Sequence, residues 1–255
     1  MLKITFLGTG TSQGVPVIAC NCRVCTSLDQ RDKRLRSSVM IEDENTLLVI
    51  DSGPDFRQQL LRAGAKKLDG LVFTHEHKDH IAGMDDIRAF NYIGRKPVDI
   101  YATHQVQSAL EREFHYVFNN EFKYPGIPEI VMHTVENKKF NVGTIELEPV
   151  LVKHFMMDVF GYRVGDFTYI TDAKSISEVE LEKIRGTGVL VLNALRREEH
   201  VSHLTLDEAV ALSQEVNAGK TYLTHISHQL GTTDEINREL PEGIELAYDG
   251  LVISL

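Results

Sequence analysis

Residues 70–80 read GLVFTHEHKDH, a short apolar run followed by a segment dense in metal-binding side chains. The first four residues have the composition of a short buried strand. His75, His77, Asp79 and His80 then follow with the spacing H-x-H-x-D-H. In an extended chain alternate residues share a side, so His75 and His77 can converge on one ion. If the chain then turns into a helix, Asp79 and His80 can face a second ion, which predicts a paired site for Zn or Mn.

Short apolar runs alternate with helical patterns on both sides of this stretch. The β content is mixed, and Gly165-Asp166 is typical of a two-residue hairpin turn. This pattern favours two mixed sheets packed face to face with helices outside, an α/β fold in one domain over residues 1–255. We expect strands at 3–7, 38–41, 47–50, 70–73, 98–102, 127–135, 144–152, 159–164, 167–170, 189–193, 220–224, 244–248 and 252–255, and helices ending at Gly64 and over 85–92, 105–118, 176–184 and 206–216.

The composition excludes several classes of protein. The 255 residues are 42% hydrophobic and carry a formal net charge of −10, so the chain is globular and offers no basic field to attract nucleic acid. There is no Trp, and no run approaches the about 20 apolar residues of a membrane span. The N-terminus is typical of a first strand rather than a signal peptide, and we expect a cytoplasmic protein. The three cysteines do not suit a disulfide framework.

The H-x-H-x-D-H segment after a strand resembles the metallo-β-lactamase superfamily, whose members add a lone His, a lone Asp and a final His in that order. This chain has His154 after LEPVLV, Asp172 at the end of FTYITD and His225 after TYLT. The resemblance implies a four-layer αβ/βα sandwich with two metals. It gives the first metal His75, His77 and His154, and the second metal Asp79, His80 and His225. Asp172 would bridge the two metals together with a water.

Asp51, at the end of the strand-like run LLVID, has two interpretations. In the resembling family an Asp at this place holds the histidine loop by hydrogen bonds. A carboxylate at a strand end is equally typical of a simple turn.

Cys20, Cys22 and Cys25 form the pattern C-x-C-x-x-C within an N-terminal loop over 18–28. A structural zinc needs four ligands and no open position. If His225 belongs to the metal pair, His228 is free to be the fourth ligand. Three buried free cysteines are the alternative, but their close spacing favours zinc.

The cysteine cluster together with LTHISHQ near the C-terminus resembles the PhnP-type branch, the phosphoribosyl 1,2-cyclic phosphate phosphodiesterases. The resemblance extends over nearly the whole chain, from GTGTSQGVP to YDGLVI. It implies hydrolysis of a small cyclic phosphate or phosphodiester by a metal-bridging hydroxide. The assignment of the ribosyl cyclic phosphate as substrate rests on the resemblance alone.

The leaving oxygen in such a reaction needs a proton. His203 lies directly before LTLDEAVAL, at the position of an acid His in PhnP-type sequences, and is the predicted general acid, with His200 as the second candidate. With Asp79 and Asp172 it makes up the predicted catalytic set. Arg88 and Arg196 are candidates for binding the substrate phosphate. Arg88 is equally suited to an ion pair on a helix surface.

Two other functions share these motifs. A tRNase Z-type RNA 3′-end endonuclease would need a basic arm, and the stretch 112–140 has only scattered lysines, Lys123 among them. A non-catalytic, metal-stabilised binding protein related to quinone-cofactor biosynthesis would not need the complete ligand set. We therefore expect a small phosphodiester as substrate, with no membrane and no nucleic acid partner. General symmetry statistics favour a homodimer.

Overall fold

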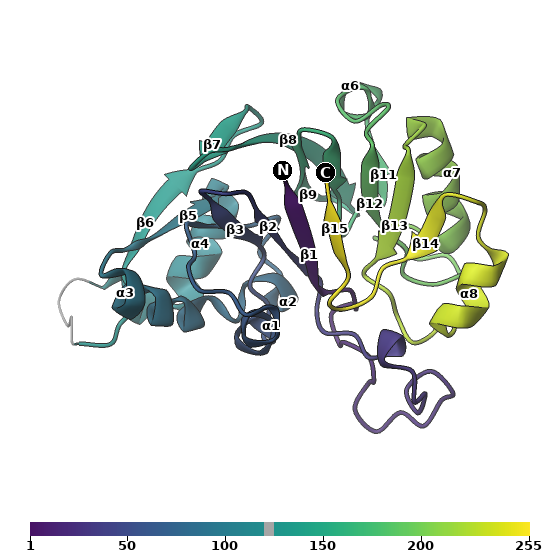
Figure 1. The fold of residues 1–255 in the computed structure, drawn as a ribbon, viewed down its shortest axis with the longest axis horizontal. Helices are drawn as coiled ribbons and strands as arrows, with labels where there is room; N and C mark the ends of the chain where they lie inside the picture. Colours follow the sequence, from purple (N-terminus) through teal and green to yellow (C-terminus); the bar gives the residue numbers. More distant parts are fainter. Residues whose placement is uncertain (120–124) are drawn as a thin grey trace.

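Two sheets stand face to face in the computed structural model, which describes residues 1–119 and 125–255 (Figure 1). In the described residues the first sheet has seven strands in the order β15-β1-β2-β3-β4-β5-β6. The strands from β15 to β3 pair antiparallel, and those from β3 to β6 pair parallel. The strands are β1 (Lys3–Gly8), β2 (Ser38–Glu42), β3 (Leu47–Ile50), β4 (Gly70–Val72), β5 (Val98–Ala102), β6 (Ile130–Thr134) and β15 (Val252–Ser254).

The second sheet repeats this mixed arrangement. Its main path is β11-β8-β9-β10-β12-β13-β14, and β7 pairs with β8 beside that path. Pairing is antiparallel from β11 to β10 and parallel from β10 to β14. The strands are β7 (Phe140–Val142), β8 (Ile145–His154), β9 (Met157–Val164), β10 (Phe167–Tyr169), β11 (Ser175–Ile176), β12 (Val189–Asn193), β13 (Lys220–Thr224) and β14 (Ile244–Leu246).

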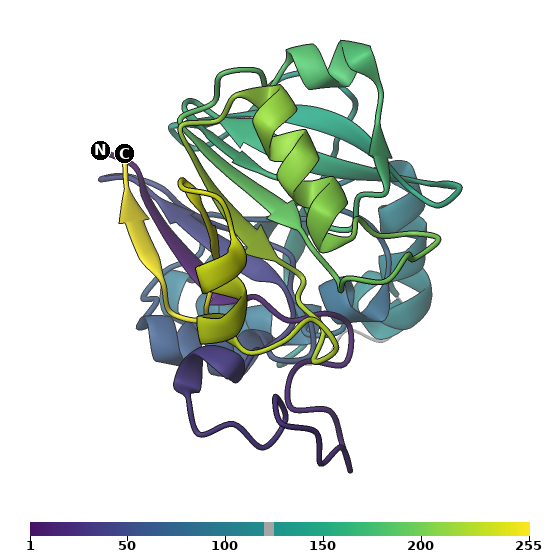
Figure 2. The same cartoon turned by 90° about the vertical axis from the view of Figure 1, so that its right-hand side faces the viewer.

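Helices cover the outer faces of both sheets (Figures 1 and 2). Those after strands of the first sheet are α1 (Phe56–Ala63), α2 (Lys78–Ile81), α3 (Arg88–Gly94), α4 (His104–Glu113) and α5 (His115–Phe118). Those of the second sheet are α6 (Glu178–Glu182), α7 (Leu206–Val216) and α8 (Thr233–Glu239). Single 3-10 turns lie at Gln30–Asp32 and Met84–Ile87.

Three apolar clusters separate the layers. In β3, Leu48 and Ile50 face the cluster between the sheets, whereas Leu47 and Val49 face the cluster under α1 and α4. A strand buried on both faces needs a continuous apolar run, which explains the sequence LLVI. A third cluster lies between the second sheet and α7, and it contains Ala209 of that helix. Three interfaces between four layers confirm the predicted four-layer αβ/βα sandwich.

Several expected boundaries differ in the structure. The helix expected over 105–118 is divided at Phe114, whose backbone leaves the helical region (φ −120°, ψ 39°) while its side chain stays in the cluster under α4. The change of direction keeps both Phe114 and Val117 buried. The helix α8 and the short strands β7 and β11 were not expected, because elements of two to seven residues carry little periodicity.

The two ends of the chain lie side by side in the first sheet, where Lys3 pairs with Ser254 (Figure 1). Among the described residues, none of the helices has the length and apolar character to span a bilayer. Lys123, part of the stretch considered for RNA binding, lies outside the described residues. The single domain, the cytoplasmic location and the homodimer stay predictions.

Candidate metal centre

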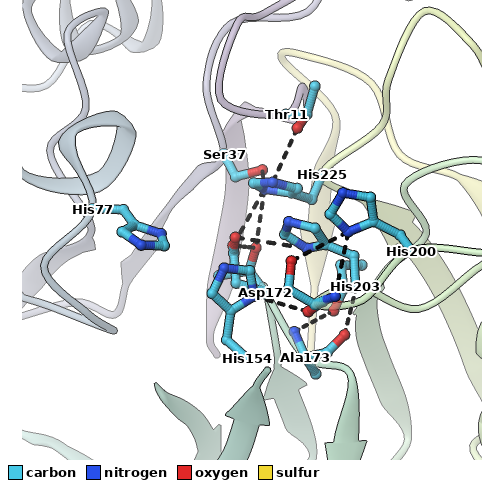
Figure 3. A network of polar contacts seen from close by, with 12 residues as sticks. Thr11, Ser37, His77, His154, Asp172, Ala173, His200, His203 and His225 are labelled. Atoms are coloured by element: carbon cyan, nitrogen blue, oxygen red, sulfur yellow. Dashed lines mark hydrogen bonds and ion pairs between the residues drawn. The ribbon is translucent and has the colours of Figure 1, made fainter. Parts of the chain in front are cut away.

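The predicted metal ligands come from separate segments that meet where strands of both sheets end. His75 and His77 follow β4, and the next two ligands, Asp79 and His80, lie in the single turn of α2. The other three lie at or just after the ends of β8, β10 and β13: His154, Asp172 and His225. Figure 3 shows the rings of His154, His203 and His225 gathered around Asp172, with His77 facing them from the first half of the chain.

The first predicted ligand group converges as three imidazoles. Nε2 of His75 lies 3.1 Å from Nδ1 of His77. Two ligands on a tetrahedral zinc, each about 2.05 Å from the ion, are about 3.3 Å apart. The ring centroid of His154 lies 5.1 Å from that of His77. Nδ1 of His154 donates to the carbonyl of Ser202 at 2.8 Å, which leaves Nε2 of that ring with a free lone pair.

The second predicted group is equally compact. Ligand atoms of Asp79, His80 and His225 lie within 4.8 Å of one another. Asp172 lies beside this group, because its Oδ2 is 3.3 Å from Nε2 of His80 and 3.2 Å from Nδ1 of His225. Asp172 also clusters with His75 and with His154. Its carboxylate is thus within reach of both groups, as a bridging ligand would have to be.

Asp51 orients the histidine loop. Its Oδ1 accepts from the backbone N–H of Thr74 at 2.9 Å, and its Oδ2 accepts from the Thr74 hydroxyl at 2.8 Å and from Nδ1 of His80 at 2.7 Å. These contacts fix the tautomer of His80 so that Nε2 faces the carboxylates of Asp79 and Asp172. Of the two interpretations open from sequence, the hydrogen bonds support the loop-holding one.

The backbone at three strand ends adopts the left-handed region. Asp51, Asp172 and His225 have φ values of 66°, 57° and 56°. Asp and His tolerate this region better than most residues, but it is uncommon without glycine. Strained backbone of this kind is typical of functional sites, because it redirects a side chain at the end of a rigid strand.

The electrostatics of the buried site favour a cation between its rings and carboxylates. Burial lowers the pKa of His80, but the carboxylates around the ring outweigh it and raise the pKa well above its ordinary value. Burial alone would raise the pKa of Asp172, yet the neighbouring imidazoles of His225 and His80 hold it well below its usual range. Burial lowers the pKa of His75, which keeps that ring neutral and able to ligate.

Two buried ring nitrogens test whether a metal pair fits. Among the described residues, Nε2 of His80 and Nδ1 of His203 make no hydrogen bond, although both are inaccessible to water. Buried polar atoms are rarely left without a partner. Nε2 of His80 faces two carboxylates, and a divalent cation there would satisfy all three groups. Imidazole and carboxylate donors suit Zn, Mn or Fe, so the residues present fit the group.

His203 lies within this cluster, and His200 lies farther out. The His203 ring is 4.5 Å from that of His154 and stacks on His225 at 4.8 Å. Burial, and then the adjacent His225, lowers the pKa of His203 to about 3. The ring of His200 is 5.1 Å from His203, and its Nδ1 accepts from the backbone N–H of Ser202 at 3.3 Å. His203 is therefore the better-placed candidate, and its role as acid stays a prediction.

The two predicted phosphate-binding arginines have protein partners. Arg88 forms an ion pair with Asp85 on the exposed side of α3. Arg196 donates to the carbonyl of Glu199 at 3.0 Å and to the side chain of Gln229 at 3.0 Å, so it braces the loop that leads to His203. Both guanidinium groups thus contact protein groups, and their binding of substrate stays a prediction.

The predicted zinc loop meets its fourth ligand in space. Nδ1 of His228 lies 3.3 Å from Sγ of Cys20 and 3.4 Å from Sγ of Cys22, and the ligand atoms of all four residues lie within 4.8 Å. These separations suit a tetrahedral zinc. The N–H of Cys25, acting with His228 and against desolvation, lowers the pKa of Cys22 to about 6, which favours the thiolate that zinc binds.

Sequence reasoning missed the residues that hold these ligands in place. Ser37 and Thr11 contact the two nitrogens of His225, each at 3.2 Å, and Thr171 donates to Asp172 at 2.6 Å. Hydroxyl residues are common at strand ends, so their positions carried no distinguishing signal. Phe155, which follows His154 directly, was not singled out from the sequence either.

Comparison with known proteins places this geometry in a family. Residues 46–226 match the model described as a beta-lactamase superfamily domain. The chain belongs to the beta-lactamase superfamily. The crystal structure of a new diphosphatase from the PhnP family is 41% identical, with a TM-score of 0.93 over 100% of this chain and 98% of that one. The predicted fold and the resemblance to the PhnP-type branch are confirmed.

Two curated relatives are longer proteins. An octanoyltransferase from Porphyromonas gingivalis is 37% identical over 253 residues, which is 98% of this chain and 51% of that protein. A ribonuclease Z from Methanosarcina acetivorans is 32% identical over 158 residues, which is 58% of this chain and 45% of that protein. The chain therefore spans about half the length of either relative, and the activity of neither transfers to it by similarity alone.

Proposed function

We propose that the chain is a metal-dependent hydrolase of small phosphoric diesters or cyclic phosphates, with His203 as the general acid. One observation carries the proposal: Asp172 lies within ligand distance of both histidine groups, and Nε2 of buried His80 faces it without a hydrogen bond. This arrangement suits a pair of cations and serves no evident structural purpose. Similarity over the whole chain to the PhnP-family diphosphatase supports the same chemistry.

Two divalent ions, when bound, supply Lewis acidity toward phosphate oxygens and make water a nucleophile at neutral pH. His75, His77 and His154 would hold one ion, and Asp79, His80 and His225 the other, with Asp172 between them. Asp51 and Ser202 keep the rings of His80 and His154 in the tautomers that leave Nε2 free.

The proton for the leaving oxygen comes from the protein in this proposal. Water loses a proton to the solvent as its oxygen bonds to phosphorus, the bond between phosphorus and the ester oxygen breaks, and His203 in its protonated form donates a proton to the departing alkoxide. His203 is neutral by itself, since its pKa is lowered to about 3. An anionic phosphate beside the ring would raise that pKa and favour the protonated form.

The identity of the substrate within this class is a second, more specific proposal. The PhnP-type resemblance favours 5-phosphoribosyl 1,2-cyclic phosphate. The neighbouring PhnP-family structure is of a diphosphatase, which makes a phosphoanhydride the second substrate class to test. Both place an anionic phosphorus centre beside two cations, so the same residues would serve either reaction.

The decisive experiment combines metal analysis with a substrate panel. Protein loaded with Zn or Mn is expected to hold two exchangeable metals besides one tightly bound zinc, and to hydrolyse bis(p-nitrophenyl) phosphate. The ribosyl cyclic phosphate, a nucleoside diphosphate and a tRNA precursor then rank the substrates. Cleavage of the tRNA precursor alone would favour the ribonuclease Z alternative. Two metals without turnover of any substrate would favour the non-catalytic binding protein.

A further inference from the structure

A cavity of about 360 Å³ opens directly beside the candidate metal centre. Its lining consists of His77, His154, Phe155, Met156, Met157, Val201 and Ser202. Two of these are candidate ligands of the first metal, so the cavity is continuous with the place where we propose that the phosphate is cleaved. None of these lining residues is Lys or Arg. Apart from the two histidines and Ser202, the lining is apolar, and we call Phe155, Met156, Met157 and Val201 the apolar wall of this cavity.

The hairpin turn that contains Phe155 has an unusual residue at its first loop position. His154 pairs with Met157 across β8 and β9, so Phe155 and Met156 are the two residues of a hairpin loop. Phe155 has φ 57°, whereas Met156 is not among the residues with positive φ. Positive φ at the first loop position alone is typical of type II′ turns, where glycine is the usual residue. A bulky aromatic residue at this position is strained, and such strain points to a use.

The apolar side chains at the rim of this cavity are exposed. Phe155 is 63% exposed, Met156 82% and Val201 70%. They come from two segments that each adjoin a site residue, since Phe155 follows His154 and Val201 lies two residues before His203. The two segments are linked by the hydrogen bond from His154 to the carbonyl of Ser202. An exposed apolar patch joined to a reaction site is typical of a ligand-binding surface.

We propose that this wall binds an aromatic ring carried by the phosphoester substrate, with the ring packed between the Phe155–Met156 turn and Val201. The inference rests on the proposed function, which supplies the phosphate end. Aromatic rings pack favourably on Phe and on the sulfur of Met. A bare sugar phosphate would leave this wall in contact with water. The wall therefore favours a nucleoside-like or aryl ester over the ribosyl cyclic phosphate.

A comparison of phenylphosphonate with methylphosphonate tests whether the wall binds a ring. Both compounds carry the same phosphonate group, and only phenylphosphonate has an aromatic ring. Their inhibition constants against bis(p-nitrophenyl) phosphate and their dissociation constants by calorimetry are measured on the metal-loaded protein. We expect phenylphosphonate to bind roughly tenfold more tightly. Phe155→Gly should bring the two ligands to near equality, leave methylphosphonate unchanged, and not lower the melting temperature, because glycine relieves the positive φ.

Two further variants keep the outcome decisive. Val201→Ser changes the opposite segment and should reduce the same ratio, even if the glycine variant folds poorly. Val179→Ala removes an equally exposed apolar side chain on α6, 74% exposed, and should leave the ratio unchanged. Equal binding of the two ligands by the unmodified protein, or an unchanged ratio in both wall variants, overturns the inference. If no phosphoester is hydrolysed, the proposed function fails, and the calorimetric ratio alone decides whether the wall binds a ring.

Discussion

At the scale of single residues, the site depends on which atom of each side chain faces inward. Asp51 accepts a hydrogen bond from Nδ1 of His80, and the carbonyl of Ser202 accepts one from Nδ1 of His154. In both rings Nε2 is therefore the nitrogen left to bind a metal. Asp172 then stands among these nitrogens with its backbone in the left-handed region. The ligands are thus positioned by partners that are not ligands themselves, which lowers the cost of ordering them when metal binds.

Replacement of Asp172 by alanine should remove the carboxylate shared by the two ligand groups. We expect metal affinity to fall by at least roughly 100-fold and hydrolysis of bis(p-nitrophenyl) phosphate to be lost, measured by elemental analysis and initial rates. Asp158→Ala removes a carboxylate that is 55% exposed and paired with Lys153, and it should change neither quantity. Full metal content with full activity in Asp172→Ala would rule out the bridging role.

The variant His203→Ala distinguishes between two roles of His203, general acid and metal ligand. Loss of a general acid should reduce turnover by roughly 10²–10⁴-fold while metal content stays constant. His200→Ala, a change in the same loop, should have little effect on turnover. Substrates with a better leaving group should suffer less from the loss, since they need less protonation. Loss of metal from His203→Ala would instead make His203 a ligand.

At the scale of elements, the short helix α6 is held to the second sheet by a few polar contacts of one buried residue. Glu180 of α6 accepts from the backbone N–H of Leu151 at 2.8 Å and from Asn137 at 2.8 Å, and it pairs with Lys183. Burial raises the pKa of Glu180, but these partners outweigh it and lower the pKa below its ordinary value. One carboxylate thus docks a helix of five residues onto β8.

The lowered pKa of Glu180 predicts a pH-dependent contribution to stability. A depressed folded-state pKa stabilises the fold above the unfolded value of about 4.3, and the contribution is lost as the pH falls through the folded value. Glu180→Gln should therefore cost about 1 kcal/mol at pH 7 and progressively less below pH 4. Urea unfolding of both proteins across this range measures the difference. A cost that stays constant down to pH 3 would contradict the prediction.

At the scale of the whole molecule, the predicted zinc loop links an N-terminal segment to the C-terminal segment that carries His225 and His228. Cys20 and His228 are 208 positions apart in sequence, and His228 lies three residues after His225. Beside this contact, Thr11 donates its backbone N–H to Ile226 at 3.1 Å and Ile226 donates to Thr9 at 2.9 Å. The loop, seen below the sheets in Figure 1, thereby anchors the segment that carries His225.

Cys22→Ser should weaken this anchor. Structural zinc contributes folding free energy directly, so we expect a lower melting temperature and one fewer zinc per chain by elemental analysis. Ile18→Ala, which changes a side chain 96% exposed in the same loop, should change neither. A protein that holds no third metal before mutation would show that the cysteine cluster is not a zinc site.

Much of the fold followed from local patterns. Apart from β7 and β11, the strands of both sheets and α7 were expected close to their observed bounds, since apolar runs and helical spacing are local features. The division of the helix at Phe114, the existence of α8 and the positive φ of Phe155 were not expected. The division at Phe114 depends on packing in the cluster under α4, which a local pattern does not encode. The helix α8 is too short to show periodicity, and positive φ is uncommon for an aromatic residue.

The sequence by itself indicated the candidate ligands of the H-x-H-x-D-H segment, because ligand chemistry is a property of residue type and close spacing, and the family resemblance added His154, Asp172 and His225. His75, His77 and His80 are specified by one heptapeptide. Only the tertiary structure decided which ring nitrogens face the site and that an aromatic residue stands at its edge. The hydrogen bonds that orient the rings join residues 29 and 48 positions apart, and such contacts exist only after the strands that precede these residues have assembled into their sheets.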